Sequence, residues 1–250
     1  MSPRFGVILD LPKNFGIKLL YGEAFRSPFA AEQALNASTL KGNPELDPET
    51  IRTFDAQLFY SSTNAYFAVT YYDSLQEDTI TRATRPSDGL LTFVNMGEVD
   101  FEGIEVESKY RPNTEWEFLG SVSYQVNEDQ TGQMDVGLVP NFMGKWGVSY
   151  DSPSGFSIGL FDSYFGEPAE LSGAPKVNPD AEKYHWMTLK SSLELRKYFQ
   201  AKTIPNIRLN LFVDNLLDED VYFPEFNFSS VNTLPSRTGI AVYGTATLKF

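Results

Sequence analysis

Ten connections separate the strand-like segments of this chain, and they alternate strictly between short and long. The short connections lie at roughly 10–14, 61–63, 111–114, 151–154 and 199–205. The long connections lie at about 26–51, 78–98, 128–140, 166–184 and 218–238. In an up-and-down antiparallel sheet, this order places every short turn at one end and every long loop at the other. Membrane-spanning β-barrels have this arrangement, whereas a Greek-key sandwich has no reason to separate its turns in this way.

Within the segments, polar and apolar residues alternate with a period of two, which predicts about eleven β-strands. In 207–214, for example, the odd positions hold Ile, Leu, Leu and Val, and the even positions hold Arg, Asn, Phe and Asp. The charged residues keep to the polar face: Glu105, Glu107, Lys109, Lys190, Glu194, Arg196, Arg208 and Asp214. A barrel needs an apolar face toward lipid and tolerates charge toward its lumen. A soluble sandwich explains the alternation equally well but leaves the order of the connections unexplained.

Composition excludes several classes of function. The net charge of −13 argues against nucleic-acid binding, which needs a basic surface. The chain has no cysteine and one histidine, His185, so zinc, haem and iron–sulfur sites have no ligand set. We interpret His185 as an interfacial or loop residue. No catalytic or nucleotide-binding motif is present, which predicts a protein that is not an enzyme and has no cofactor.

Two acidic groups and the two chain ends carry further expectations. Asp218–Asp220 and the carboxylates of Glu45, Asp47 and Glu49 could bind Ca²⁺, but they lack EF-hand spacing, which favours solvated loop charge. The start "MSPRFGVILDLP" has no signal-peptide pattern. The end "AVYGTATLKF" alternates up to its last residue, so we expect the chain to finish inside a sheet.

Five segments then follow one another in a familiar order. They are "YGEAFRSP" at 21–28, "GNPELDPETIRTFD" at 42–55, "NMGEVDFEGIEVE" at 95–107, "VDNLLDEDVY" at 213–222 and the terminal strand that ends in Phe. Together they resemble the C-terminal barrel portion of TonB-dependent outer-membrane receptors. The resemblance covers nearly the whole chain.

The resemblance implies an all-β fold, an antiparallel up-and-down transmembrane β-barrel with about eleven strands of a 22-stranded barrel. Residues 1–250 would be the C-terminal part of the barrel, with the plug domain and the signal peptide absent. We therefore expect a fragment from a truncated reading frame or a split gene. A complete eleven-stranded barrel is less favoured because bacterial single-chain barrels have even strand numbers. Phe250 would be the signal that the outer-membrane assembly machinery reads, or would only fill an interface groove.

The resemblance also implies a function in the outer membrane of a Gram-negative bacterium. The whole receptor would take up a scarce nutrient, such as siderophore-bound iron, cobalamin or a glycan, with energy from TonB relayed through the missing plug. This chain would supply lipid-facing wall and outer loops. Two other interpretations stay open: a passive porin-like channel or adhesin, and a soluble carbohydrate-binding β-sandwich.

Candidate ligand contacts lie in the last long connection. "VYFPEFNF" places the rings of Tyr222, Phe223, Phe226 and Phe228 in a stretch that we expect outside the cell. These rings could instead pack within the loop or continue an interfacial belt. Arg26 could face the lumen and contact a plug, but we favour a structural role for it at the end of a strand.

Overall fold

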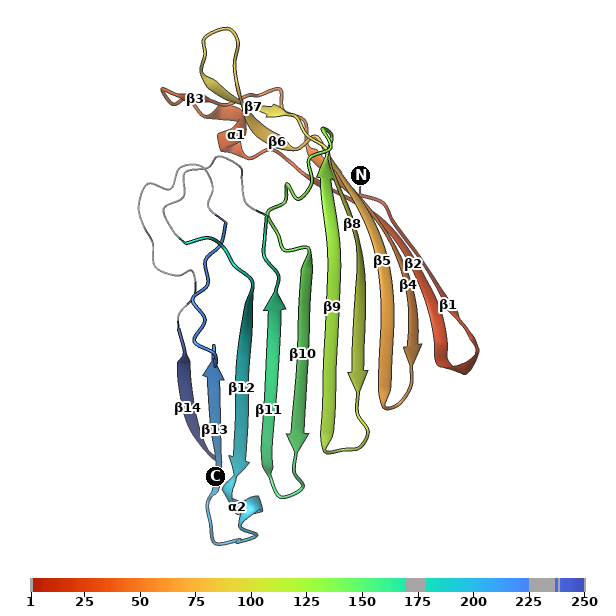
Figure 1. Ribbon diagram of the computed structural model, residues 1–250, viewed down its shortest axis with the longest axis vertical. Coiled ribbons are helices and arrows are strands. Elements are labelled where there is room, and N and C mark those ends of the chain that lie inside the picture. Colours follow the sequence, from red (N-terminus) through yellow and green to blue (C-terminus); the bar gives the residue numbers. More distant parts are fainter. Residues whose placement is uncertain (1, 170–178, 225–236, 238, 250) are drawn as a thin grey trace. The chain divides into compact units, whose positions relative to one another are not determined.

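The computed structural model describes residues 2–169, 179–224, 237 and 239–249 (Figure 1). In these residues, eleven strands form one antiparallel sheet in the order β1-β2-β4-β5-β8-β9-β10-β11-β12-β13-β14. The strands are β1 Arg4–Asp10, β2 Phe15–Arg26, β4 Glu49–Ser61, β5 Ala65–Glu77, β8 Val99–Tyr110, β9 Trp116–Asp129, β10 Phe142–Asp151, β11 Phe156–Phe165, β12 Tyr184–Glu194, β13 Asn206–Asp214 and β14 Ala241–Lys249. Each strand of this sheet lies beside its neighbours in the chain, so the up-and-down prediction is confirmed. The same order contradicts a sandwich, which would divide the strands between two packed sheets.

The strands lie in two compact units, which we describe separately. Unit 1 comprises residues 1–58, 70–104 and 125–137, and unit 2 comprises residues 59–69, 105–124 and 138–250. None of the helices among the described residues is long and apolar enough to cross a membrane.

The short connections are confirmed, with one correction. The first contains the 3-10 turn η1, Pro12–Asn14. The last begins with the helix α2, Leu195–Tyr198, four residues before the predicted start at 199. The alternation had placed Arg196 in a strand, but β12 ends at Glu194 and the helix begins at the next residue. The reason is local, because the Arg196 side chain donates from Nε to the carbonyl oxygen of Ile204, 2.9 Å away, and closes the turn on itself.

The long connections of unit 1 are more regular than the sequence predicted. The first holds the helix α1, Ala30–Ala34, and strand β3, Leu40–Lys41; the second holds β6, Ile80–Thr84, and β7, Leu91–Asn95. These strands form a second sheet in the order β3-β7-β6. The strands were missed because segments of two to five residues are too short to reveal a period.

Strand register in unit 2 separates an apolar face from a polar face. Residues paired across neighbouring strands lie on the same face of a sheet. One row of paired residues runs Phe118, Val148, Leu160, Leu189, Val213 and Val242. The next row runs Glu117, Ser149, Gly159, Lys190, Phe212 and Tyr243. The predicted division of charge between the faces is therefore confirmed in these rows.

The two faces of unit 2 suit different surroundings. On the apolar face, large side chains stay uncovered, as Leu209 shows with 40% of its surface exposed. On the polar face, charges meet opposite charges: Lys109 Nζ lies 3.2 Å from Glu117 Oε2, and Arg208 pairs with Glu194. A continuous exposed apolar surface is unfavourable in water and matches the lipid-facing side of a barrel.

Candidate functional site in the long connections of unit 1

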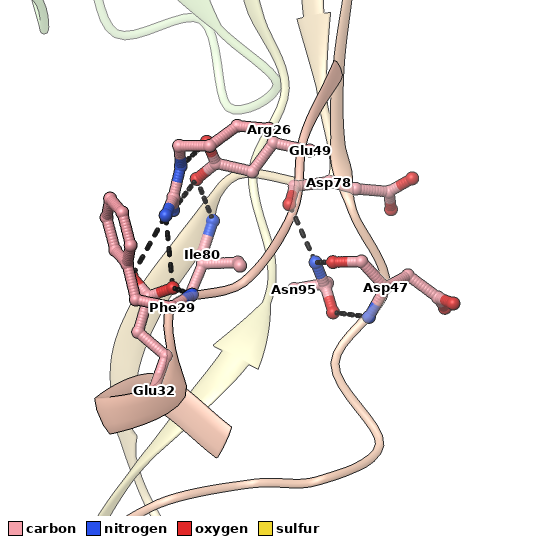
Figure 2. Close-up of polar contacts among 8 residues, drawn as sticks. All are labelled: Arg26, Phe29, Glu32, Asp47, Glu49, Asp78, Ile80 and Asn95. Carbon is pink, nitrogen blue, oxygen red and sulfur yellow. Dashed lines mark hydrogen bonds and ion pairs between the residues drawn. The ribbon is translucent and has the colours of Figure 1, made fainter. Parts of the chain in front are cut away.

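Two long connections of unit 1 form a single structure that we call the loop platform, residues 26–49 and 77–99. It contains α1 and the small sheet of β3, β7 and β6. Three of the sequence segments that carry the family resemblance meet here, and two side chains join them. Figure 2 shows these two side chains, Arg26 and Asn95, with the groups that they bind.

Arg26 is the last residue of β2 and joins three segments of the platform (Figure 2). Its Nε and Nη2 atoms donate to Glu49 Oε2 and Oε1 at 2.5 and 2.7 Å, a bidentate pair. Its Nη1 atom donates to Glu32 Oε2 in α1 at 3.0 Å. The guanidinium carbon also lies 4.9 Å from the centroid of the Phe29 ring.

Glu49, the first residue of β4, extends the same network to the second long connection. Its side chain is buried, with 8% of the residue exposed, and its Oε1 accepts from the backbone N–H of Ile80 at 2.7 Å. The hydrogen bonds from Arg26 lower the pKa of Glu49, against the opposing effect of burial, and the Ile80 N–H lowers it further. Glu49 in turn raises the pKa of Arg26 above its ordinary value, and Glu32 adds to this effect. The platform therefore depends on an ionised Glu49.

Acid should open the loop platform. Because the pKa of Glu49 is lower in the folded chain than in the unfolded one, the pair stabilises the platform above the unfolded value, which is about 4.3. This contribution is lost as the pH falls through the folded-state pKa. We expect pepsin to cleave residues 26–49 faster as the pH falls below about 4, after correction for its own pH profile. In Glu49→Gln, cleavage should be fast throughout and should not show this transition.

Asn95, the last residue of β7, joins the same two connections at a second point (Figure 2). Its Oδ1 accepts from the backbone N–H of Asp47 at 2.8 Å, and its Nδ2 donates to the carbonyl of Asp47 at 2.9 Å. The same Nδ2 donates to the carbonyl of Asp78 at 2.8 Å. One amide side chain thus satisfies three backbone groups, which only a group with both a donor and an acceptor can do.

Asn95→Asp is expected to loosen the loop platform, although the two side chains have nearly the same size. The carboxylate keeps an acceptor for the Asp47 N–H but loses both donors and faces two carbonyl oxygens. At about 1 kcal/mol per hydrogen bond, local opening should become easier by roughly 1–2 kcal/mol. Hydrogen exchange at residues 47 and 78–80 measures this. Unchanged exchange in Asn95→Asp would show that the bridge does not hold the connections together.

The fourth motif, 213–222, folds the chain back at the end of β13. Asn215 is fully buried at a φ of 50°, its Oδ1 accepts from the Glu219 N–H at 2.8 Å, and its Nδ2 donates to the Glu219 carbonyl at 2.9 Å. Asp218 accepts from the backbone N–H of Ile240 at 2.8 Å, just before β14. Asp218 therefore has a structural role rather than being the freely solvated charge predicted from its acidic neighbours.

In the other acidic group, Glu45, Asp47 and Glu49, one residue is not the solvated loop charge that the sequence predicted. Glu49 is buried and paired with Arg26, whereas Glu45 and Asp47 are exposed. Across the described residues, no group of three or more His, Asp or Glu side chains is placed to hold a metal ion. Arg26 is hydrogen-bonded to Glu49 and Glu32, which supports the structural interpretation preferred for it.

Two of the predicted ligand contacts, Tyr222 and Phe223, lie among the described residues, and both belong to unit 2. Tyr222 is half-buried next to the buried Val221, and Phe223 is exposed. Phe226, Phe228 and Phe250 lie outside the described residues. Ligand contact by the four rings and the assembly role of Phe250 stay predictions.

Sequence reasoning missed the bridging role of Asn95. The only signal was its position directly before "MGEV", a turn in which Gly97 has a φ of 142°. Its partners at 47 and 78 are far away in the sequence. The resulting arrangement can hold two long loops in one shape, with large apolar side chains such as Phe29 and Met96 exposed on it. A surface whose loops are already ordered suits recognition of a ligand or partner, because binding does not have to order the loops.

Comparison with known proteins gives a family. The sequence model described as "TonB dependent receptor-like, beta-barrel" matches residues 1–216. No curated protein sequence matches the chain significantly.

Solved structures with this fold include one transporter and two receptors. The copper transporter OprC is 16% identical with a TM-score of 0.73 over 100% of this chain. The ferric-catecholate import receptor Fiu from E. coli K12 is 17% identical with a TM-score of 0.70 over 98%. The pyoverdine outer membrane receptor FpvA from Pseudomonas aeruginosa PAO1 is 12% identical with a TM-score of 0.77 over 100%.

The chain spans 39%, 34% and 36% of those three proteins, respectively. The match over residues 1–216 agrees with the eleven-stranded up-and-down sheet and with the apolar and polar faces of unit 2. The chain belongs to the TonB-dependent receptor-like β-barrel family.

Proposed function

We propose that this chain supplies wall and outer loops of an outer-membrane receptor that imports a scarce nutrient with energy from TonB. The observation that carries the proposal is the family match over residues 1–216 together with the loop platform on the long connections. The nutrient class that we propose is a metal ion or a metal chelate such as a ferric siderophore. The titles of the similar structures name copper, a ferric catecholate and pyoverdine for those proteins.

The two faces of unit 2 support the membrane part of the proposal. The row through Leu160 and Leu189 would meet lipid, and the row through Lys190 would meet the lumen. The polar face carries a groove whose lining includes Glu107, Lys109, Lys145, Phe161 and Ser163. The Phe161 ring packs against Gly147 and Gly159, where a Cβ would clash with ring atoms. A charged and aromatic wall suits a lumen filled by water and another protein segment.

We further propose that residues 1–250 are the C-terminal part of the barrel of a larger receptor. A plug domain would lie against the polar face and relay the energy from TonB. The outer-membrane assembly machinery would recognise the terminal strand, and lipid would surround the apolar face. Tyr222, Phe223, Phe226 and Phe228 would contribute ligand contacts.

Nutrient uptake by cells tests this proposal. Deletion of the gene should abolish accumulation of one radiolabelled member of a panel of ferric siderophores, copper, cobalamin and oligosaccharides. A protonophore should abolish the same uptake in the parent strain, because TonB draws on the inner-membrane proton gradient. If deletion leaves uptake of the whole panel unchanged, the proposal is wrong.

A passive channel is the second candidate. The polar face of unit 2 favours it equally, because a water-filled pore needs the same wall. A channel would pass small solutes down their gradient whether or not the protonophore is present. Gene-dependent uptake that resists the protonophore would therefore replace the receptor with a channel.

A further inference from the structure

One carboxylate interrupts the apolar face of unit 2. Asp162 lies two residues beyond Leu160 on β11, in a row with Gly120, Trp146 and Met187. Its side chain is only 3% exposed, and its Oδ1 has no hydrogen-bond partner among the described residues. A buried carboxylate on a face that belongs toward lipid is unfavourable unless something compensates it.

The compensation comes from His185. Its Nδ1 lies 2.7 Å from Asp162 Oδ2. His185 is paired with Tyr164, which is two residues beyond Asp162 on β11 and lies on the same face. The imidazole packs against two rings, with centroids 4.9 Å from Tyr164 and 5.9 Å from Trp146. Since Asp162 engages Nδ1, the ring has one polar atom left, Nε2, and the side chain is 43% exposed.

The position along the strands puts this cluster at a membrane interface. Rings gather at both ends of the apolar face: Trp116 and Tyr150 near the short connections, and Phe142 and Tyr164 near the long ones. From Tyr150 to Phe142 on β10 the distance is about 27 Å at ~3.4 Å per residue, which a tilt of about 40° reduces to roughly 20 Å. That height approaches the ~25 Å apolar band of outer-membrane barrels, whose aromatic girdles mark the headgroup level.

We propose that His185 binds the phosphate of a lipid in the leaflet next to the long connections. An imidazole that donates from Nδ1 to Asp162 and from Nε2 to a phosphate oxygen satisfies both nitrogens and neutralises the carboxylate. Lys183 lies two residues before His185 and is exposed. Its ammonium group would be a second cation near the lipid phosphate. Trp146 and Tyr164 supply the amphipathic rings that favour this depth.

The Trp146 ring packs over the backbone beside the cluster. Gly144 lies opposite Tyr164, and a Cβ there would be 3.0 Å from the Trp146 ring, so this ring occupies the site that a side chain would take. A lipid hydroxyl is the weaker alternative, because it carries no negative charge to stabilise a doubly protonated imidazole beside Asp162. The inference rests on the proposed membrane position of the apolar face.

Solid-state NMR on labelled histidine tests the contact directly. The full protein as its gene encodes it is purified from outer membranes with isotope-labelled histidine, and placed in nanodiscs of phosphatidylglycerol. The His185 signals are identified by their loss in His185→Gln. We expect a proton on both ring nitrogens, and dephasing of the Nε2 signal by lipid phosphorus.

Three comparisons make the result specific. In nanodiscs of an uncharged galactolipid, the Nε2 signal should show no dephasing, with or without added inorganic phosphate. If inorganic phosphate dephases the signal in these nanodiscs, the site binds a free anion and not a lipid. Lys183→Gln should weaken the contact between Nε2 and phosphorus. Lys197 is also exposed but lies in α2, after the opposite end of β12, so Lys197→Gln should leave the contact unchanged. An Nε2 without a proton, or without dephasing in phosphatidylglycerol, would overturn the inference.

Failure of this inference can be told apart from failure of the proposed function. His185→Gln should retain nutrient uptake in cells, because His185 lies on the face turned away from the lumen. Intact uptake with no phosphate contact would overturn only the lipid site. Loss of insertion into nanodiscs, measured by heat-modifiable migration, would overturn the membrane position on which both rest.

Discussion

Leu209→Arg is expected to stop the protein from accumulating in the outer membrane. Leu209 lies on the apolar face of unit 2, paired with Leu193 and Ala246, and 40% of it is exposed. An arginine on the lipid side of a barrel costs about 2–4 kcal/mol at mid-bilayer and less toward the interfaces. Urea unfolding in lipid vesicles should show this loss, and heat-modifiable migration of membrane fractions should show less folded protein.

Asn210→Arg is the matched control. Asn210 is the next residue on β13, so its side chain lies on the polar face, where it donates to Thr245 Oγ1 at 3.0 Å. The same arginine there should cost only that hydrogen bond, about 1 kcal/mol. Equal losses for the two variants, or a larger loss for Asn210→Arg, would contradict the assignment of the faces.

Arg26→Ala is expected to release the loop platform while leaving the strands folded. Removing one partner of a buried ion pair leaves the other charge uncompensated, which costs about 3–5 kcal/mol. The Arg26 side chain is 34% exposed, so solvent reduces the expected local loss to about 2–3 kcal/mol. Hydrogen exchange should accelerate at Ile80, whose N–H bonds to Glu49, and through residues 26–49.

Two variants control for the loss of charge and for the shape of the donor. Arg85 pairs with Asp88 in the turn between β6 and β7, where both are well exposed, so Arg85→Ala should leave exchange nearly unchanged. Arg26→Lys should restore little, because an ammonium cannot donate a bidentate pair to Glu49 while also reaching Glu32. If exchange at Ile80 and through residues 26–49 is as slow in Arg26→Ala as in the unchanged protein, other contacts hold the loop platform together.

The faces and the order of the strands could be predicted from the sequence because they depend on local alternation. Leu209 and Arg208 lie on opposite faces whatever their partners are. The loop platform could not be predicted in this way. Arg26, Glu49 and Ile80 lie 23 and 31 residues apart, and no local pattern indicates that an arginine after one strand meets a glutamate before the next.

Asp162 shows the same limit on the apolar face. The alternation of Ile158 and Leu160 predicts another apolar residue at 162, and the carboxylate there breaks the pattern. Its partner His185 is 23 residues away, across the connection between β11 and β12. Only the register of the two strands explains how the carboxylate is tolerated.

Cysteine labelling in intact cells tests most directly whether this chain spans the outer membrane with its long connections outside. The chain has no cysteine of its own, so single substitutions report without background from it. Ser87→Cys lies in the turn between β6 and β7, and Thr114→Cys lies in the short connection between β8 and β9. We predict that a membrane-impermeant maleimide labels Ser87→Cys in intact cells and labels Thr114→Cys only after the outer membrane is permeabilised. Labelling of Thr114→Cys but not Ser87→Cys in intact cells, or of neither until the inner membrane is broken, would contradict the account.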